Sequence, residues 1–157
     1  MEYFRLVHNH HKKVSYQNKT IQWQPPPNGF FKLNTDHAYD ENSKAGGGGG
    51  LIRNHNGDWI TGYTIYNYTH SSIHMEILAF YNGLRLALNH KLAPLIVEIN
   101  SQVLSQLLSS NNLAFSHMLM DCRNLLEKLG SPQVGHIFRE ANAVADKLAC
   151  YGKGRDP

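Results

Sequence analysis

The chain has 157 residues, about the length of one domain, and 41% of its residues are hydrophobic while 17% are charged. This composition is typical of a soluble globular protein, and no apolar run approaches the roughly 20 residues that cross a bilayer, so we expect no membrane partner. The N-terminus lacks the apolar segment of a secretory signal, and Cys122 and Cys150 lack metal-ligand spacing. We therefore expect reduced core thiols in an intracellular protein of the nucleus or cytoplasm.

The formal charge of +3 belongs entirely to residues 1–22, which carry four basic residues and one acidic residue. This segment also contains His8, His10 and His11 but shows no hydrophobic periodicity, so we predict a flexible basic, His-rich arm. A solvated tail explains the three histidines better than a metal site does. The rest of the chain has balanced charge, so the sequence shows no basic face there for gripping many phosphates.

A stiff segment with three consecutive prolines begins at Trp23 and ends in a turn at Asn28-Gly29. We place one domain at residues 23–152 and a short tail at residues 153–157.

The first half of this domain has the pattern of antiparallel strands. Residues 30–35 alternate between apolar and polar, and residues 59–68 form another strand after a turn at Asn56-Gly57. Between them, the glycine run at 46–50 precedes a strand and lacks the Lys-Ser/Thr of a phosphate-binding loop. We interpret the run as permitting a bulge or a close backbone approach.

The second half alternates helix and strand. The expected elements are a helix capped by Ser71-Ser72, a strand at 95–99 after Pro94, a helix from Ser101 to Leu108, a helix at 115–129, a strand at 134–138 and a helix at 141–150. This order predicts an α/β fold with a five-stranded mixed sheet, three antiparallel strands followed by parallel strands, flanked by helices.

Three carboxylates stand at positions that are unfavourable for an isolated charge or that adjoin helix starts: Asp36, Glu76 and Asp146. Asp146 alone could simply complement a helix dipole, but Glu76 lies on an apolar helix face, where an unpaired acid is rare. Asp36 is expected to end its strand. Carboxylates gathered from distant positions hold Mg²⁺ for phosphoryl chemistry, so the three together favour a metal site.

Asn100 follows a predicted strand in the same manner but offers a neutral amide. Glu98 points to the same face two residues earlier, about 6–7 Å along the strand, which is too far for it to replace an acid at position 100.

Several motifs occur together in one order. They are Trp23-x-Pro25-Pro26-Pro27, Leu33-Asn34-Thr35-Asp36, the glycine run, Ile52 through Gly57, Met75-Glu76-Ile77-Leu78, Asn100-Ser101-Gln102 and His136 through Asp146. In these motifs and their spacing, residues 23–152 resemble a type 1 ribonuclease H domain, in particular the plant subgroup that occurs alone or in non-LTR retrotransposon reverse transcriptases.

The resemblance implies metal-dependent endonucleolytic cleavage of the RNA strand in RNA–DNA hybrids. It places Asp36, Glu76, Asn100 and Asp146 as ligands of two Mg²⁺ or Mn²⁺ ions, with the second ion weakened because Asn100 replaces an acid. It also gives His136 a part in proton transfer or product release. A strand-end histidine satisfied by the backbone explains His136 equally well.

The resemblance further places His37, Ser101 and Asn142 at the substrate. His37 stands where the family commonly has glycine, and its ring could obstruct the hybrid. Asn142 matches a polar loop residue, although capping the last helix explains it as well.

We therefore expect a monomeric ribonuclease H-type domain that binds an RNA–DNA hybrid or another nucleic acid, with cleavage weakened or lost through Asn100. Two alternatives stay open: a catalytically inactive nucleic-acid-binding module and a protein-interaction module, both of retroelement origin. Hybrid binding without cleavage would favour the first, and no binding would favour the second.

Overall fold

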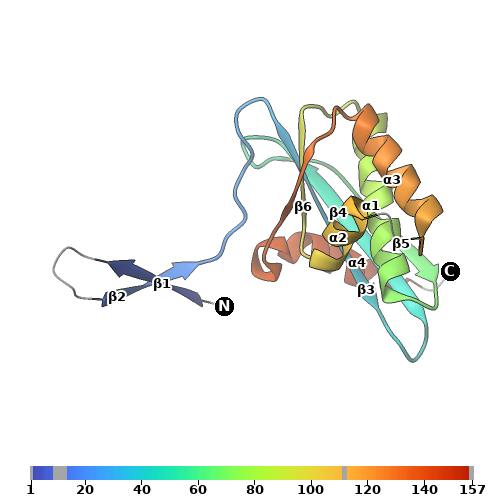
Figure 1. Ribbon diagram of the computed structural model, residues 1–157, viewed down its shortest axis with the longest axis horizontal. Coiled ribbons are helices and arrows are strands. Elements are labelled where there is room, and N and C mark those ends of the chain that lie inside the picture. The colour runs from blue at the N-terminus through green and yellow to red at the C-terminus, as the bar shows by residue number, and fades with distance from the viewer. Residues whose placement is uncertain (1, 9–13, 111–112, 156–157) are drawn as a thin grey trace.

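The computed structural model describes residues 2–8, 14–110 and 113–155 (Figure 1). The strands are β1 (Glu2–His8), β2 (Val14–Thr20), β3 (Phe31–Tyr39), β4 (Ala45–Arg53), β5 (Trp59–Tyr68), β6 (Leu95–Ile99) and β7 (Gln133–His136). The helices are α1 (Ser72–Asn89), α2 (Gln102–Ser109), α3 (Ser116–Lys128) and α4 (Ala143–Lys153), with a 3₁₀ turn at Arg139–Asn142. The predicted α/β class is confirmed.

Five strands form one mixed sheet in the order β5-β4-β3-β6-β7. The three strands β3, β4 and β5 pair in antiparallel fashion, and β6 and β7 extend the sheet in parallel, as predicted. Local signals placed several boundaries correctly: the Ser71 hydroxyl caps α1 and the Ser101 hydroxyl caps α2 by accepting backbone N–H groups of the first turn.

The central strand β3 continues to Tyr39 rather than ending at Asp36. It pairs with β6 only as far as Thr35, but with β4 it pairs through Tyr39. The expected strand end was therefore wrong, because the partner β4, not the local pattern, determines how far β3 extends. Asp36 is the first residue of β3 beyond the β6 pairing.

The glycine run lies inside β4 and brings helix backbones close to the sheet. A Cβ atom at Gly47 would collide with backbone atoms of Ala149 and Lys153 on α4, whereas one at Gly48 would meet Ala79 on α1 at 2.9 Å. The predicted close approach is confirmed, and the register irregularity of β4 lies later, between Ile52 and Arg53.

The main core lies between the sheet and the pair α1 and α3 (Figure 1), while α4 packs on the opposite face. Phe80 of α1, Leu33 of β3 and Leu119 of α3 are fully buried in it. Cys122 also belongs to this core, but Cys150 is exposed on the outer side of α4, so the expectation of two core thiols was wrong for Cys150.

In residues 1–22, β1 and β2 pair with each other as an antiparallel hairpin. The sequence predicted no regular element there, because two strands that pair only with each other can satisfy backbone groups without the hydrophobic periodicity of a packed strand. His10 and His11 lie outside the described residues. Over the ranges that are described, no helix is both long and apolar enough to span a bilayer.

Candidate active site

Asp36 is a buried carboxylate on the central strand, with 7% of its surface exposed. Its Oδ1 accepts the backbone N–H of His37 at 2.8 Å. Burial raises the pKa of Asp36 to about 6, the His37 N–H opposes this rise, the charge of Asp146 adds to it and the charge of Arg139 opposes it. Asp36 therefore lies within electrostatic range of a second acid from the last helix.

Glu76 lies on α1 between Met75 and Ile77, both fully buried, and is itself only 8% exposed. Burial raises the pKa of Glu76, a hydrogen bond from the Ser101 side chain opposes this rise, and the charge of Asp36 adds to it. Asp36 and Glu76 thus repel each other in a region of low solvent access.

Asn100 follows β6 directly and is half-buried. The last β3–β6 pair joins Thr35 to Ile99, so Asn100 and Asp36 both come one residue after that pair, at the same edge of the sheet. Asp146 is half-buried in the first turn of α4. Convergence of all four residues on shared ions stays a prediction, because among the described residues no three His, Cys, Asp or Glu side chains form a metal-binding group.

The donor chemistry nevertheless fits a divalent cation. Within the described residues the ion pairs are Lys32–Glu98 and Lys44–Glu41, so neither Asp36 nor Glu76 has a cationic partner within ion-pair distance. Two buried, mutually repelling carboxylates lose most of their desolvation penalty when a cation joins them, and Mg²⁺ prefers such oxygens.

The two candidate histidines differ in exposure, since His136 is exposed and His37 is half-buried. His136 ends β7, pairs with Ile99 in the sheet and is exposed, with its ring edge-on to Phe138 at 5.7 Å between centroids. His37 directs Nε2 to the Ser72 hydroxyl at 2.9 Å, and burial lowers its pKa. The start of α1 holds the His37 ring, and obstruction of the substrate by this ring stays a prediction.

Ser101 and Asn142 make contacts that the sequence did not reveal. Ser101 accepts the Leu104 N–H at 3.3 Å and also bonds Glu76, so one hydroxyl links the start of α2 to the candidate site. Asn142 does not cap α4 with its side chain, contrary to one interpretation; instead its Nδ2 donates to the Thr35 carbonyl at 3.1 Å.

A second group of polar residues, buried or half-buried, lies nearer the start of β3 than Asp36 does. We call it the Trp23 cluster: Trp23, Lys32, Asn34, Arg53 and Glu98. Lys32 Nζ lies 2.7 Å from Glu98 Oε1, and Asn34 donates to Glu98 Oε2 at 2.9 Å. The Trp23 indole N–H donates to Asn34 Oδ1 at 2.9 Å, and the Arg53 guanidinium stacks 3.6 Å from the Trp23 ring centroid. Glu98 is thus already paired, which adds to the distance argument against its replacing an acid at position 100.

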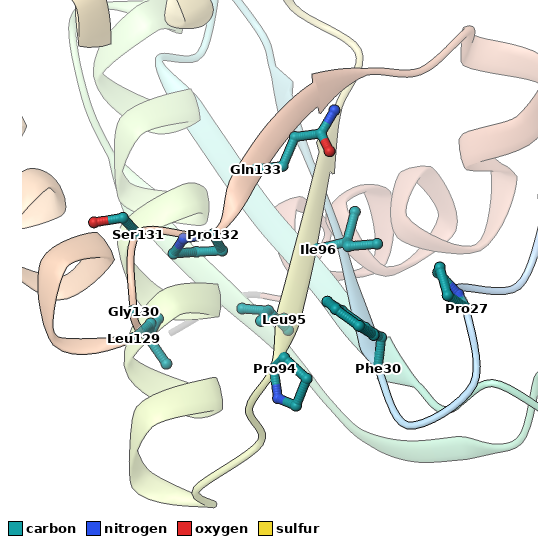
Figure 2. Close-up of a pocket in the computed structure, with 10 residues that line it drawn as sticks. All are labelled: Pro27, Phe30, Pro94, Leu95, Ile96, Leu129, Gly130, Ser131, Pro132 and Gln133. Atoms are coloured by element: carbon teal, nitrogen blue, oxygen red, sulfur yellow. The ribbon is translucent and has the colours of Figure 1, made fainter.

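A cavity of about 370 Å³ lies between the starts of β6 and β7 (Figure 2). Phe30, Pro94, Leu95 and Pro132 are among its lining residues. Because Asn100 and His136 lie at the other ends of these strands, this cavity is at the opposite edge of the sheet from Asp36 and is not part of the candidate site.

Residues 34–152 match a family model described as reverse transcriptase-like. The chain belongs to this family. It is 31% identical over 136 residues to a putative ribonuclease H protein of Arabidopsis thaliana, covering 85% of this chain but 22% of the relative, so the chain spans about a fifth of that relative's length.

Solved structures of low identity share the ribonuclease H fold with this reverse transcriptase-like chain. RNase H1 of Halobacterium salinarum matches with a TM-score of 0.72 at 18% identity, over 78% of this chain and 96% of that one. LC11-RNase H1 in complex with an RNA/DNA hybrid matches with a TM-score of 0.66 at 21% identity, over 75% and 92%. A foamy viral protease-reverse transcriptase with an RNA/DNA hybrid matches with a TM-score of 0.64 at 18% identity, over 80% and 20%.

Proposed function

We propose that residues 23–152 form a monomeric ribonuclease H-type domain that binds RNA–DNA hybrids. Its inherited chemistry is divalent-metal-dependent hydrolysis of the RNA strand, weakened by Asn100. The observation that carries this proposal is the buried pair of Asp36 and Glu76. Burial and the charge of Asp146 raise the pKa of Asp36, and burial and the charge of Asp36 raise the pKa of Glu76. Such pairs cluster at functional sites.

Asp36 and Glu76 would hold a Mg²⁺ or Mn²⁺ ion, Asp146 would add a third carboxylate, and Asn100 would offer a neutral oxygen. The chemistry supplied by such an ion would be activation of water and compensation of the charge that develops on the phosphate. The protein's own contribution is orientation: the His37 N–H fixes Asp36 Oδ1, and the Ser101 hydroxyl fixes Glu76. His136 is exposed at the same edge of the sheet, and we assign it a part in proton transfer or product release.

The fold and two solved structures that share it support an RNA–DNA hybrid as the substrate. Two of the solved structures described above contain an RNA/DNA hybrid. A hybrid is recognised through its A-form sugar and phosphate groups rather than base edges. Arg139, whose charge acts on Asp36, would face a backbone phosphate, and the net positive segment 1–22 would add salt-sensitive attraction.

The alternative is a domain that binds the hybrid without cutting it. Two observations favour this alternative: Asn100 is an amide, and among the described residues no three acids or histidines group as a metal centre. Salt-dependent hybrid binding with no metal-dependent cleavage would support it. Absence of any hybrid binding would favour a protein-interaction module.

The test is a cleavage assay on a hybrid with end-labelled RNA, in Mg²⁺ and separately in Mn²⁺. We expect slow cleavage that EDTA stops and that the Asp36→Asn variant lacks. Glu41→Gln, an exposed acid of the β3–β4 turn, is the matched control and should cut like the unmodified protein. Equal product from Asp36→Asn and the unmodified chain would contradict the proposal.

A further inference from the structure

We propose that Asn142 is a positioning residue that holds Asp146 beside Asp36. This inference rests on the proposed function, because it concerns how the last carboxylate reaches the candidate site. Asn142 touches neither substrate nor metal in this account; it acts through α4.

The Asn142 side chain ties the start of α4 to the central strand. It is 1% exposed, and its Nδ2 donates to the backbone carbonyl of Thr35 at 3.1 Å across 107 positions of sequence. Thr35 directly precedes Asp36, so the bond fastens α4 next to the buried carboxylate.

The orientation of this amide is determined by its partner. A backbone carbonyl only accepts hydrogen bonds, so the nitrogen of Asn142 must face Thr35. The Asn142 Oδ1 is then buried without a hydrogen-bond partner. An unpaired buried acceptor costs free energy, so stability alone does not account for an amide at this position.

The spacing between Asn142 and Asp146 connects the Asn142–Thr35 hydrogen bond to the position of the Asp146 carboxylate. Asp146 lies four residues after Asn142, about one helical turn, so the two lie near the same side of the helix start. Besides its contacts with β3 and β5, α4 packs on Gly47 and Gly49 of β4, which offer it no side chains. The Asn142–Thr35 bond is a directional contact that opposes rotation or sliding of α4 at the end where Asp146 stands.

The first arm of the test measures metal binding rather than activity. Titration calorimetry with Mn²⁺ should show roughly tenfold weaker binding for Asn142→Leu than for the unmodified protein, the low end for losing a residue that orients a ligand. Asn82→Leu is the matched control, since it also removes an amide that donates to a backbone carbonyl, Leu78 O at 2.8 Å, but within α1. It should bind Mn²⁺ within about twofold of the unmodified protein.

The second arm needs no metal. In EDTA at pH 8, Asp146→Asn should raise the thermal midpoint because it removes repulsion with Asp36. In the Asn142→Leu background the same change should give a much smaller rise, because Asp146 is no longer held there. If Asn142→Leu does not fold, Asn142→Ala takes its place in both arms.

The outcomes separate the two proposals. If the unmodified protein binds no Mn²⁺, the proposed function fails and the metal-free arm alone decides the role of Asn142. Equal rises on Asp146→Asn in both backgrounds, or unchanged Mn²⁺ affinity in a folded Asn142 variant, would overturn the positioning role.

Discussion

The Trp23 cluster and the Asp36–Glu76 pair are two groups of buried or half-buried polar side chains, each with a member on β3, and their charges are arranged in opposite ways. In the cluster, the charges of Lys32 and Glu98 are paired at 2.7 Å, and Asn34 bonds both Glu98 and Trp23. At the other group, like charges face each other, and burial raises the pKa of both acids. The opposite charges of Lys32 and Glu98 stabilise the fold. The like charges of Asp36 and Glu76 have no cationic partner and mark a place for a cation.

The largest expected effect is on the cleavage rate and comes from adding an acid beside the Asp36–Glu76 pair. Asn100→Asp restores one negative charge to a site that must hold divalent cations, and cleavage of the hybrid should rise roughly 10²–10³-fold, the scale for a key electrostatic group. Initial rates in Mg²⁺ measure this. Asn34→Asp is the matched control, because it places an acid on β3 within the Trp23 cluster and should give no gain.

A substitution at His37 tests a second cause of weak cleavage, obstruction of the hybrid by the His37 ring. If Asn100→Asp alone gives no gain but Asn100→Asp with His37→Gly does, the ring also obstructs the hybrid. An unmodified protein that already cuts as fast as Asn100→Asp would show that the amide is no defect.

The next effect is the pH dependence of stability without metal. Asp36 has a pKa of about 6 in the fold and 3.8 as the reference, so between these values the folded state holds a proton that the unfolded chain has lost. Stability should therefore fall as pH rises from about 4 to 6, by at most about 3 kcal/mol at 1.36 kcal/mol per pKa unit. Urea unfolding in EDTA should show this fall, and Asp36→Asn should reduce it to the part that the raised pKa of Glu76 contributes. A flat profile for the unmodified protein would contradict the raised pKa.

Removing the charge of Glu98 from the Trp23 cluster should lower stability, whereas removing the charge of Asp36 should not. Glu98→Gln leaves the Lys32 ammonium buried without its counter-charge and should lower the free energy of unfolding by about 2 kcal/mol, somewhat less than for a fully buried pair. Asp36→Asn at pH 8 in EDTA should be neutral or stabilising in the same urea assay. A destabilising Asp36→Asn of similar size would erase the distinction between the two groups.

The smallest expected effect is on stability and comes from replacing Arg53, whose guanidinium stacks on the Trp23 ring. Arg53→Lys keeps the charge but loses the planar contact with Trp23 and the 3.3 Å bond to Asn34, so stability should fall by about 1 kcal/mol. Arg85→Lys is the matched control, since its guanidinium lies 5.6 Å from the Tyr81 ring centroid and that contact is weaker. Equal losses at both positions, measured by urea unfolding, would show that the stacking contributes little.

Local patterns predicted much of this architecture. The bounds of β5 and β6 and the caps of α1 and α2 follow from turn residues, alternation and serine hydroxyls that act within a few positions. The length of β3 was missed because it depends on β4, a separate strand. The burial of Glu76 was inferable from its apolar helix face and was predicted, whereas Asp36 was expected only at a strand end that is unfavourable for a charge.

The contacts that orient these acids were not predictable in the same way. The Ser101–Glu76 and Asn142–Thr35 bonds join separate elements, and residue spacing carries no signal for such pairs. Alternation predicted that Glu98 shares a face with Asn100, which stays a prediction, and it did not predict the bonds that Glu98 makes with Asn34 and Lys32. The sequence order of the acids was informative, while their exact approach depends on how α1 and α4 sit on the sheet.

The proposed function requires that the carboxylates of Asp36 and Glu76, and not the Trp23 cluster, bind a divalent cation. The most direct measurement is the rise in thermal midpoint on adding Mn²⁺ at pH 8, compared among the unmodified protein, Asp36→Asn, Glu76→Gln and Glu98→Gln. A ligand that binds only the folded state raises this midpoint. We expect a rise for the unmodified protein and for Glu98→Gln, and none for Asp36→Asn or Glu76→Gln. The same rise in all four proteins, or no rise in any, would contradict it.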